Sequence, residues 1–244
     1  MMWKLALIGF GATCLLLAAD EAKQKVQVSN TQRMDFPSGG TLRLVNSIGV
    51  LTVEAWDRPD VEITTIKSTK DAYDTREREE AARELDKVRV AAERRGDELV
   101  ITTTFPRHRF RHPVAGEGDF DLEYRIKAPG NTRIIAKHDV GEVNIDGLVS
   151  DIAVTLVQGQ INLSLPEEGQ YDVYAKSDFG NVNSDLPGSE KRTRWLIGHR
   201  IVNEDSPGTH KLNLRVKFGD IVILKKLVPK ATESQIPASK ANGL

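Results

Sequence analysis

The hexapeptide RHRFRH, at residues 107–112, places three arginines and two histidines around a single phenylalanine. Guanidinium groups bind phosphate, sulfate or carboxylate through paired hydrogen bonds. Arg107, His108, Arg109, Arg111 and His112 therefore predict a site for an anion or an acidic glycan. A metal site at the two histidines is disfavoured, because their i, i+4 spacing suits a helix and a proline stands on either side of the segment. A solvated loop, balanced by the acidic residues that follow, is the remaining interpretation.

Acidic and aromatic residues offer two further kinds of chemistry. Asp139, Asp178 and Asp220 each stand beside a recurring glycine, so their carboxylates could line one edge if their segments were neighbours. Polysaccharide-cleaving enzymes need such converging acids, sometimes with Ca²⁺, but aspartate is also an ordinary turn residue. Trp56 and Trp195 could stack on sugars or pack inside the protein. Neither a nucleophile-elbow motif nor a phosphate-binding loop occurs, so we expect no enzyme, no metal and no cofactor.

The glycines beside those aspartates belong to a repeat, seen in KHDVGEVNID, KSDFGNVNSD and VKFGDIVILK. From residue 141 onward, successive members are 18, 21, 18 and 21 residues apart, and an aliphatic residue usually follows two positions later. The segment NSIGVLTVEA carries the same signature near the start of the chain. Glycine suits a corner of the chain that needs positive φ. The predicted turn glycines are Gly49, Gly141, Gly159, Gly180, Gly198 and Gly219.

This period, with short alternating runs between the glycines, predicts an all-β protein. The favoured architecture is a right- or left-handed β-solenoid with 18–21 residues per coil, each coil stacked on the one before. Alternation places one set of aliphatic side chains on the inward face. These residues are Ile152, Val154, Ile161, Leu163, Leu165, Val173, Leu212, Leu214, Ile221 and Ile223. The alternative is a β-sandwich whose hairpin turns are regularly spaced.

The stretch 25–135 is expected to form an N-terminal β region with an inserted helix and hairpins, before the solenoid repeats of 136–226. DAYDTREREEAARELDKV predicts a helix near 74–88, capped by Asp74 or Thr75. The narrow apolar stripe of this helix comprises Ala81, Ala82, Leu85 and Val88. VRVAAERRGDELVITTTFP predicts a hairpin that turns at Gly-Asp.

The first 19 residues predict a signal peptide, because a short basic start precedes an apolar run that is too short to span a bilayer. Cleavage is expected after Ala19, which would remove Cys14, the only cysteine. A lipid anchor at Cys14 is the alternative. The tail, 227–244, is expected to be disordered. A formal net charge of −1 argues against nucleic-acid binding, and no transmembrane span is expected after cleavage.

Several segments occur in the order found in one bacterial envelope family: LVNSIGVLTVEAWDRPDVEI, the charged helix, GDELVITTTFP, FDLEYRIKAP and SDFGNVNSDLP. The chain resembles this "putative adhesin" family of exported β-strand-repeat proteins, a domain of unknown function, over residues 26–226. The resemblance implies an exported protein with a β-solenoid body. Family members are not known for an enzymatic activity, so the resemblance also implies a non-enzymatic role.

These features predict an exported cell-envelope protein, located in the periplasm or at the cell surface. Its expected role is a non-enzymatic binding, adhesion or scaffolding module, with an envelope protein or a glycan as partner. One alternative is a carbohydrate-active enzyme, a polysaccharide lyase or hydrolase, on a β-helix. Another is an envelope-stress signalling component that a second protein recognises. The sequence sets no oligomeric state.

Overall fold

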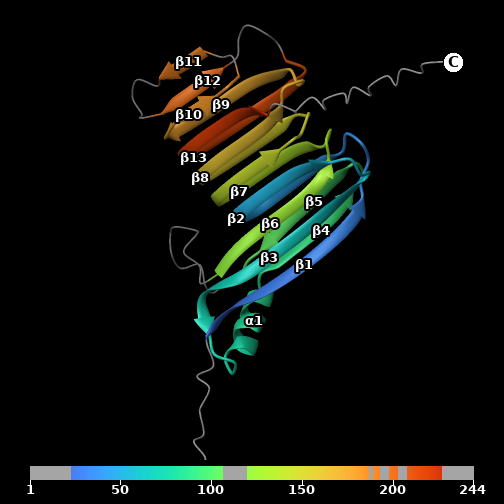
Figure 1. The fold of residues 1–244 in the computed structure, drawn as a ribbon, viewed down its shortest axis with the longest axis vertical. Helices are drawn as coiled ribbons and strands as arrows, with labels where there is room; N and C mark the ends of the chain where they lie inside the picture. Colours follow the sequence, from blue (N-terminus) through green and yellow to red (C-terminus); the bar gives the residue numbers. More distant parts are fainter. Residues whose placement is uncertain (1–22, 107–119, 187–188, 193–197, 203–207, 227–244) are drawn as a thin grey trace, which may run out of the picture.

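The computed structural model of the 244-residue chain describes residues 23–106, 120–186, 189–192, 198–202 and 208–226. Within these ranges the chain forms thirteen β-strands and one helix, and the strands join in one large mixed sheet (Figure 1). The elements are β1 (Gln24–Asp35), β2 (Thr41–Trp56), β3 (Asp60–Tyr73), α1 (Arg78–Asp86), β4 (Arg89–Arg95), β5 (Glu98–Thr104), β6 (Phe120–Pro129), β7 (Arg133–Asp146), β8 (Ile152–Pro166), β9 (Tyr171–Phe179), β10 (Val182–Ser184), β11 (Ser189–Arg192), β12 (His199–Val202) and β13 (His210–Lys226). The predicted all-β class is confirmed.

The main path through the sheet runs β1-β3-β6-β2-β7-β8-β13-β9-β12-β11. Neighbours from β6 to β9 along this path are parallel, whereas the pairs nearer the two ends are antiparallel. β4 and β5 form the predicted hairpin, and β5 also pairs with β2. The parallel section in the middle therefore links two antiparallel ends.

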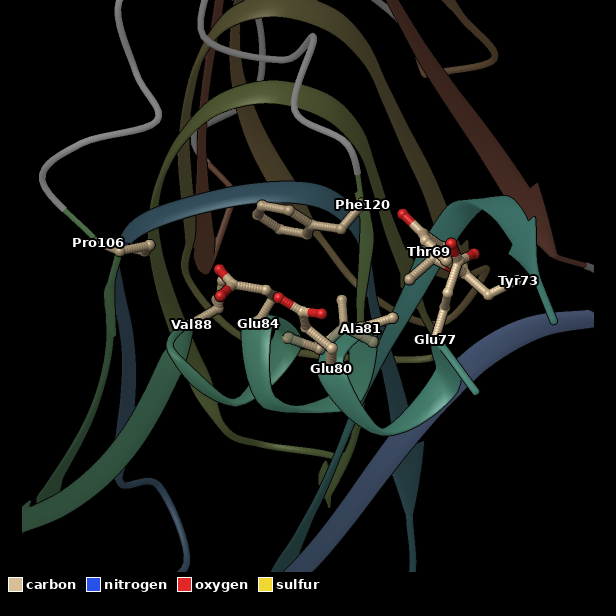
Figure 2. A pocket seen from close by; sticks show the side chains of 10 residues that line it. Thr69, Tyr73, Glu77, Glu80, Ala81, Glu84, Val88, Pro106 and Phe120 are labelled. Carbon is tan, nitrogen blue, oxygen red and sulfur yellow. The ribbon is translucent and has the colours of Figure 1, made fainter. Parts of the chain in front are cut away.

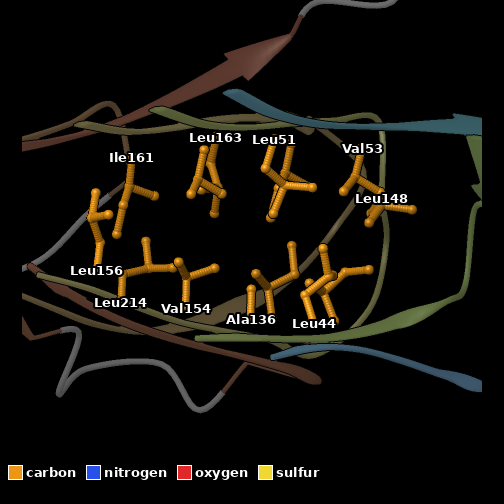
Figure 3. Close-up of a cluster of buried hydrophobic side chains, with 14 of the residues drawn as sticks. Leu44, Leu51, Val53, Ala136, Leu148, Val154, Leu156, Ile161, Leu163 and Leu214 are labelled. Atoms are coloured by element: carbon orange, nitrogen blue, oxygen red, sulfur yellow. The ribbon is translucent and has the colours of Figure 1, made fainter. Parts of the chain in front are cut away.

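The long central strands bend, so that each contributes one half to either of two facing walls. At β2 the walls part: residues 41–45 pair with β5, and residues 50–56 pair with β6. β7, β8 and β13 carry both halves. Figure 3 shows Leu44 and Val154 of the first halves on one wall, and Leu163 of a second half on the other. The core consists of the apolar side chains packed between the two walls, so the molecule has a layered β architecture.

The ten residues that alternation assigned to the inward face are all buried, each with an exposed fraction of 1% or less. This prediction is confirmed. Their strands face solvent on one side and the opposite wall on the other, which is the arrangement that alternation with a period of two describes.

The repeated glycines lie in one row across the sheet, at the bend. In spatial order the row is Gly49, Gly141, Gly159, Gly219, Gly180 and Gly198. The first five of these have φ between +88° and +153°. A Cβ atom on Gly159 would lie 1.7 Å from the carbonyl oxygen of Gly141. Glycine is therefore required at the bend by the close approach of neighbouring backbones as well as by the sign of φ.

The expectation that each coil stacks on the one before is wrong at the C-terminal end. β13 lies between β8 and β9, so Gly219 separates Gly159 from Gly180. β13 spans both walls in one continuous strand, as β8 does, and pairs with β8 in register over both halves. β9 and β10 follow the same bent path in two shorter pieces. β13, which matches the full length of β8, therefore pairs with the edge of β8 in place of the shorter β9 and β10.

Helix α1 lies beside β1 and β3 at one end of the molecule (Figure 1). Asp74 Oδ1 accepts hydrogen bonds from the backbone N–H groups of Arg76 and Glu77, at 3.0 and 3.1 Å, and so satisfies donors just ahead of the first helical turn. Ala81 and Leu85 are buried on the sheet side of the helix.

Candidate functional site: a basic face with an aromatic patch

The outward face of the first wall carries a row of cationic side chains on adjacent strands. Lys137 of β7 is paired with Thr155 of β8, Thr155 with Arg215 of β13, Arg215 with Lys176 of β9, and Lys176 with Arg200 of β12. We call these five residues the basic row. Neighbouring strands are ~4.8 Å apart, so the row is about 19 Å long. Four of its five positions bear a positive charge.

Alternation along each strand explains why these side chains face solvent. Arg215, for example, stands between Leu214 and Val216, both of which are buried in the core. Because parallel strands pair in register, outward positions at one level form a continuous line across the sheet. The basic row is such a line, assembled from segments that are far apart in the sequence.

Tyr174 lies between two arginines of the basic row. The guanidinium carbon of Arg215 is 5.3 Å from the ring centroid, and that of Arg200 is 5.9 Å away, both within the range of a cation–π contact. Within the described residues, the buried Nε of Arg200 has no hydrogen-bond partner. Buried donors normally have a partner, so this N–H is an exception among the described residues.

An exposed apolar patch adjoins the basic row at the bend. Phe179 and Phe218 stack with their ring centroids 4.9 Å apart, although 39% and 43% of their surfaces remain exposed. Lys217 Nζ lies 5.3 Å from the Phe218 ring. Val157 is also exposed. We call Val157, Phe179 and Phe218 the aromatic patch.

A shallow cavity of about 310 Å³ opens on the same face, and its lining includes Thr155, Val157, Tyr174, Lys176 and Arg215. Three residues of the basic row, Thr155, Lys176 and Arg215, thus border the same cavity as Val157 of the aromatic patch. One acid lies within it: Asp178 Oδ1 is 2.5 Å from Lys176 Nζ. The remaining cations of the row leave the surface with a net positive charge.

The outward face of the second wall has a different chemistry. Asn162 Nδ2 donates hydrogen bonds to Glu142 Oε1 at 2.9 Å and to Asn144 Oδ1 at 2.8 Å. Asp146 accepts from Lys226 Nζ at 2.7 and 3.0 Å. Amides and acid–base pairs dominate there, so the described part of this face has no row of cations on adjacent strands like that of the first wall.

The structure separates the three aspartates considered as an acidic site. Asp139 of β7 and Asp178 of β9 have two strands, β8 and β13, between them. Three strand spacings of ~4.8 Å place the two carboxylates roughly 14 Å apart. Asp220 lies beyond the bend, where its Oδ1 accepts a hydrogen bond from the backbone N–H of Asn181 at 2.7 Å. These carboxylates therefore do not share one edge, and their positions do not make the converging pair that glycoside cleavage needs.

The predicted anion site at Arg107, His108, Arg109, Arg111 and His112 lies outside the described residues, as does Trp195. Trp56 is part of a contact between strand ends. Its Nε1 donates to the carbonyl oxygen of Asp60 at 2.8 Å, and its ring lies under the guanidinium groups of Arg33 and Arg58.

Sequence reasoning missed the basic row. Its only sequence signal is that cations stand at outward positions of several strands, for example in NLRVKF and VYAKSD. That signal becomes a site only when the pairing is known, since β13 intervenes between β8 and β9. In the part of the chain that the structure describes, no three His, Cys, Asp or Glu side chains gather closely enough to hold a metal ion. Among the same residues, no helix has both the length and the apolar character needed to cross a bilayer.

No protein-family model and no curated protein sequence matches this chain. It is similar in structure to a putative cell adhesion protein from Clostridium sporogenes, with 13% identity, a TM-score of 0.45, and coverage of 82% of this chain and 100% of that one. A putative adhesin from Bacteroides fragilis is 11% identical, with a TM-score of 0.28 and coverage of 81% and 97%. One from Parabacteroides merdae is 12% identical, with a TM-score of 0.25 and coverage of 83% and 93%. TM-scores this low assign neither a family nor a ligand to this chain.

Proposed function

We propose that this protein is a non-enzymatic binding module that holds an extended acidic glycan on its basic face. The observation that carries the proposal is the basic row, in which four cations on adjacent strands form a line about 19 Å long. A ligand with one acidic group on successive sugars can meet these cations at intervals of one or two strands. Arg forks pair with carboxylate or sulfate groups through two hydrogen bonds, which adds orientation to attraction.

The aromatic patch supports a glycan over other polyanions. Faces of Phe and Tyr rings offer flat apolar surface, which suits the C–H faces of sugar rings. Phe218 and Phe179 present such surface beside the cations. The wall behind them is a sheet with a packed core, so the backbone positions of the binding groups are fixed before the ligand arrives, and only their side chains need to be ordered on binding.

Binding of a uronic-acid polysaccharide, measured by titration calorimetry at low and at physiological salt, tests this proposal. We expect binding that weakens several-fold with salt, because exposed charges are screened. The double variant Lys137→Ala/Arg215→Ala is expected to bind at least ~10-fold more weakly, a loss of about 1.4 kcal/mol. Arg125→Ala/Lys127→Ala removes the same charge from exposed positions of β6 on the other wall and is the matched control.

Three results would contradict the proposal. Equal losses in both double variants would show that net charge alone attracts the polysaccharide. Equally tight binding of single-stranded DNA would make the face a general polyanion surface. If neutral dextran binds, and binds equally well to the Lys137→Ala/Arg215→Ala variant, the cations are not needed for binding.

We further propose that β2, β7 and β8 form a short β-solenoid, which ends where β13 enters the sheet out of chain order. In-register parallel pairing of β2, β7 and β8, with an 18-residue offset between Gly141 and Gly159, supports this. Export to the periplasm or the cell surface is proposed from residues 1–19 alone. N-terminal sequencing of protein from the envelope fraction tests the export: Asp20 as the first residue agrees with it, and an intact Met1 in the cytosolic fraction contradicts it.

A further inference from the structure

A second candidate site lies at the opposite end of the molecule from β9 and β12, against helix α1 (Figure 1). There a cavity of about 210 Å³ opens between α1 and the ends of β3 and β6, and we call it the α1 pocket. Its lining includes Thr69 and Tyr73 of β3, Ala81 and Leu85 of α1, and Phe120 of β6. A cavity of ~150 Å³ accepts benzene, so the α1 pocket has room for one aromatic or large aliphatic side chain.

Three glutamates stand at the mouth of this apolar pocket. Glu77, Glu80 and Glu84 are spaced three and four residues apart, which places them along one face of the helix. Figure 2 shows the Glu80 and Glu84 side chains rising from the helix toward Phe120 across the pocket. Glu77 and Glu80 are exposed, and Glu84 is half-buried, 2.5 Å from Lys87 Nζ. Among the described residues, Glu77 and Glu80 therefore place exposed negative charge at the mouth, above an apolar floor.

We propose that the α1 pocket binds a cationic segment of a partner protein, with one aromatic side chain in the pocket and neighbouring Lys or Arg residues on the glutamates. Charge complementarity selects this occupant. An acidic or neutral segment gains no ionic contact with the exposed carboxylates of Glu77 and Glu80, whereas a basic one pairs with them. An aromatic anchor flanked by Arg also has the composition of residues that dominate protein interfaces. The site is separate from the basic face, so a glycan and a protein can be held at the two ends of one molecule.

The test uses the full chain and a dye-labelled peptide that has one phenylalanine flanked on each side by two arginines. Fluorescence anisotropy is expected to show saturable binding that weakens with salt. Replacing the phenylalanine by alanine, or the arginines by glutamates, is expected to weaken binding at least ~10-fold. Glu80→Gln, at the mouth, is expected to weaken binding about 2- to 5-fold, the effect of losing ~0.4–1 kcal/mol at one rim charge.

Glu79→Gln is the matched control. It removes the same charge from the adjacent position, where Glu79 lies 3.8 Å from Arg83 instead of at the pocket. Unchanged binding in Glu79→Gln together with a loss in Glu80→Gln supports the proposal. Equal losses in both variants, or equal binding of the glutamate-flanked peptide, overturn it. Much tighter peptide binding after Phe110→Ala would identify the chain's own residue as the occupant and would also overturn it. Polysaccharide binding should be unchanged in Glu79→Gln and Glu80→Gln, so failure of this proposal can be distinguished from failure of the proposed function.

Discussion

The hydroxyl oxygen of Ser47 lies 2.8 Å from Nδ1 of His138, and Nε2 of the same ring lies 3.0 Å from the carbonyl oxygen of Gly49. A carbonyl only accepts, so Nε2 carries the ring proton and Nδ1 accepts from Ser47. His138 is 1% exposed and fills the space beside the irregular register of β2, where Asn46 has φ of +56°. A buried ring with both nitrogens engaged in this way is structural, despite its likeness to a serine–histidine catalytic pair.

This pair predicts a loss of stability in mild acid. Burial lowers the pKa of His138, so the unfolded chain binds the proton more readily than the folded one. The contribution of the neutral ring is complete above the ordinary histidine pKa of about 6.5 and is lost as the pH falls below it toward the folded value. We expect urea unfolding to show a decrease of about 1 kcal/mol between pH 7.5 and 5.5. In His138→Gln this decrease should shrink, and an undiminished decrease would assign the effect to other groups.

The row of glycines predicts that alanine is not tolerated at the bend. In Gly159→Ala the new Cβ would lie 1.7 Å from the carbonyl oxygen of Gly141, at φ of +135°. We expect a loss of ~3 kcal/mol or more in the free energy of unfolding. Gly130→Ala is the control, because no atom lies within 4 Å of its new Cβ. A change within ~0.5 kcal/mol is expected there. Similar unfolding midpoints for the two variants would contradict the role of the row.

A buried hydrogen bond joins β5 to β6, between Tyr124 Oη and Thr103 Oγ1 at 2.6 Å. Burial raises the pKa of Tyr124, so its phenol stays protonated over the whole range in which the protein is handled. Tyr124→Phe leaves the threonine hydroxyl without this partner and is expected to cost ~1–3 kcal/mol. Thr103→Val should cost a similar amount. In the double variant the loss should be smaller than the sum, and strict additivity would show that the two groups do not interact.

The stacked rings of Phe179 and Phe218 are expected to contribute more to binding than to stability. Both are more than one-third exposed, so Phe218→Ala should lower the free energy of unfolding by no more than ~1 kcal/mol. Polysaccharide affinity should fall about 3- to 10-fold, the effect of ~0.7–1.4 kcal/mol. Leu224→Ala removes a comparably exposed apolar side chain at the end of β13 and is the control. An equal loss of affinity in Leu224→Ala would exclude a specific role for the patch.

Local pattern was sufficient to predict the core. Residues such as Val154 and Leu163 alternate with polar neighbours, and alternation assigns a face to each side chain whatever strand lies beside it. The helix follows from the same kind of information, since Ala81 and Leu85 recur at helical spacing in a stretch without Gly or Pro. The hairpin of β4 and β5 could be predicted from a glycine between two alternating runs, and in the structure this residue, Gly96, has φ of +68°.

The candidate site could not be predicted in this way. The expected anion site came from a cluster that is local in the sequence, RHRFRH, whereas the basic row is local only in space. Lys176 and Arg215 are neighbours because β13 enters the sheet beside β9, and nothing in either segment specifies that partner. The α1 pocket likewise depends on the position of the end of β6, which places Phe120 across the pocket from Ala81.

The sequence by itself thus determined which side chains are buried, where the chain bends and that the protein is all-β. These properties depend on residue size, polarity and φ at single positions and their near neighbours. Only the tertiary structure decided the order of the strands, and with it the line of cations on the outward face. Strand order depends on which exposed backbone edge a segment pairs with, and backbone hydrogen bonds are the same for every sequence. The choice rests on length and register over many residues, so that β13, which spans both walls, covers β8.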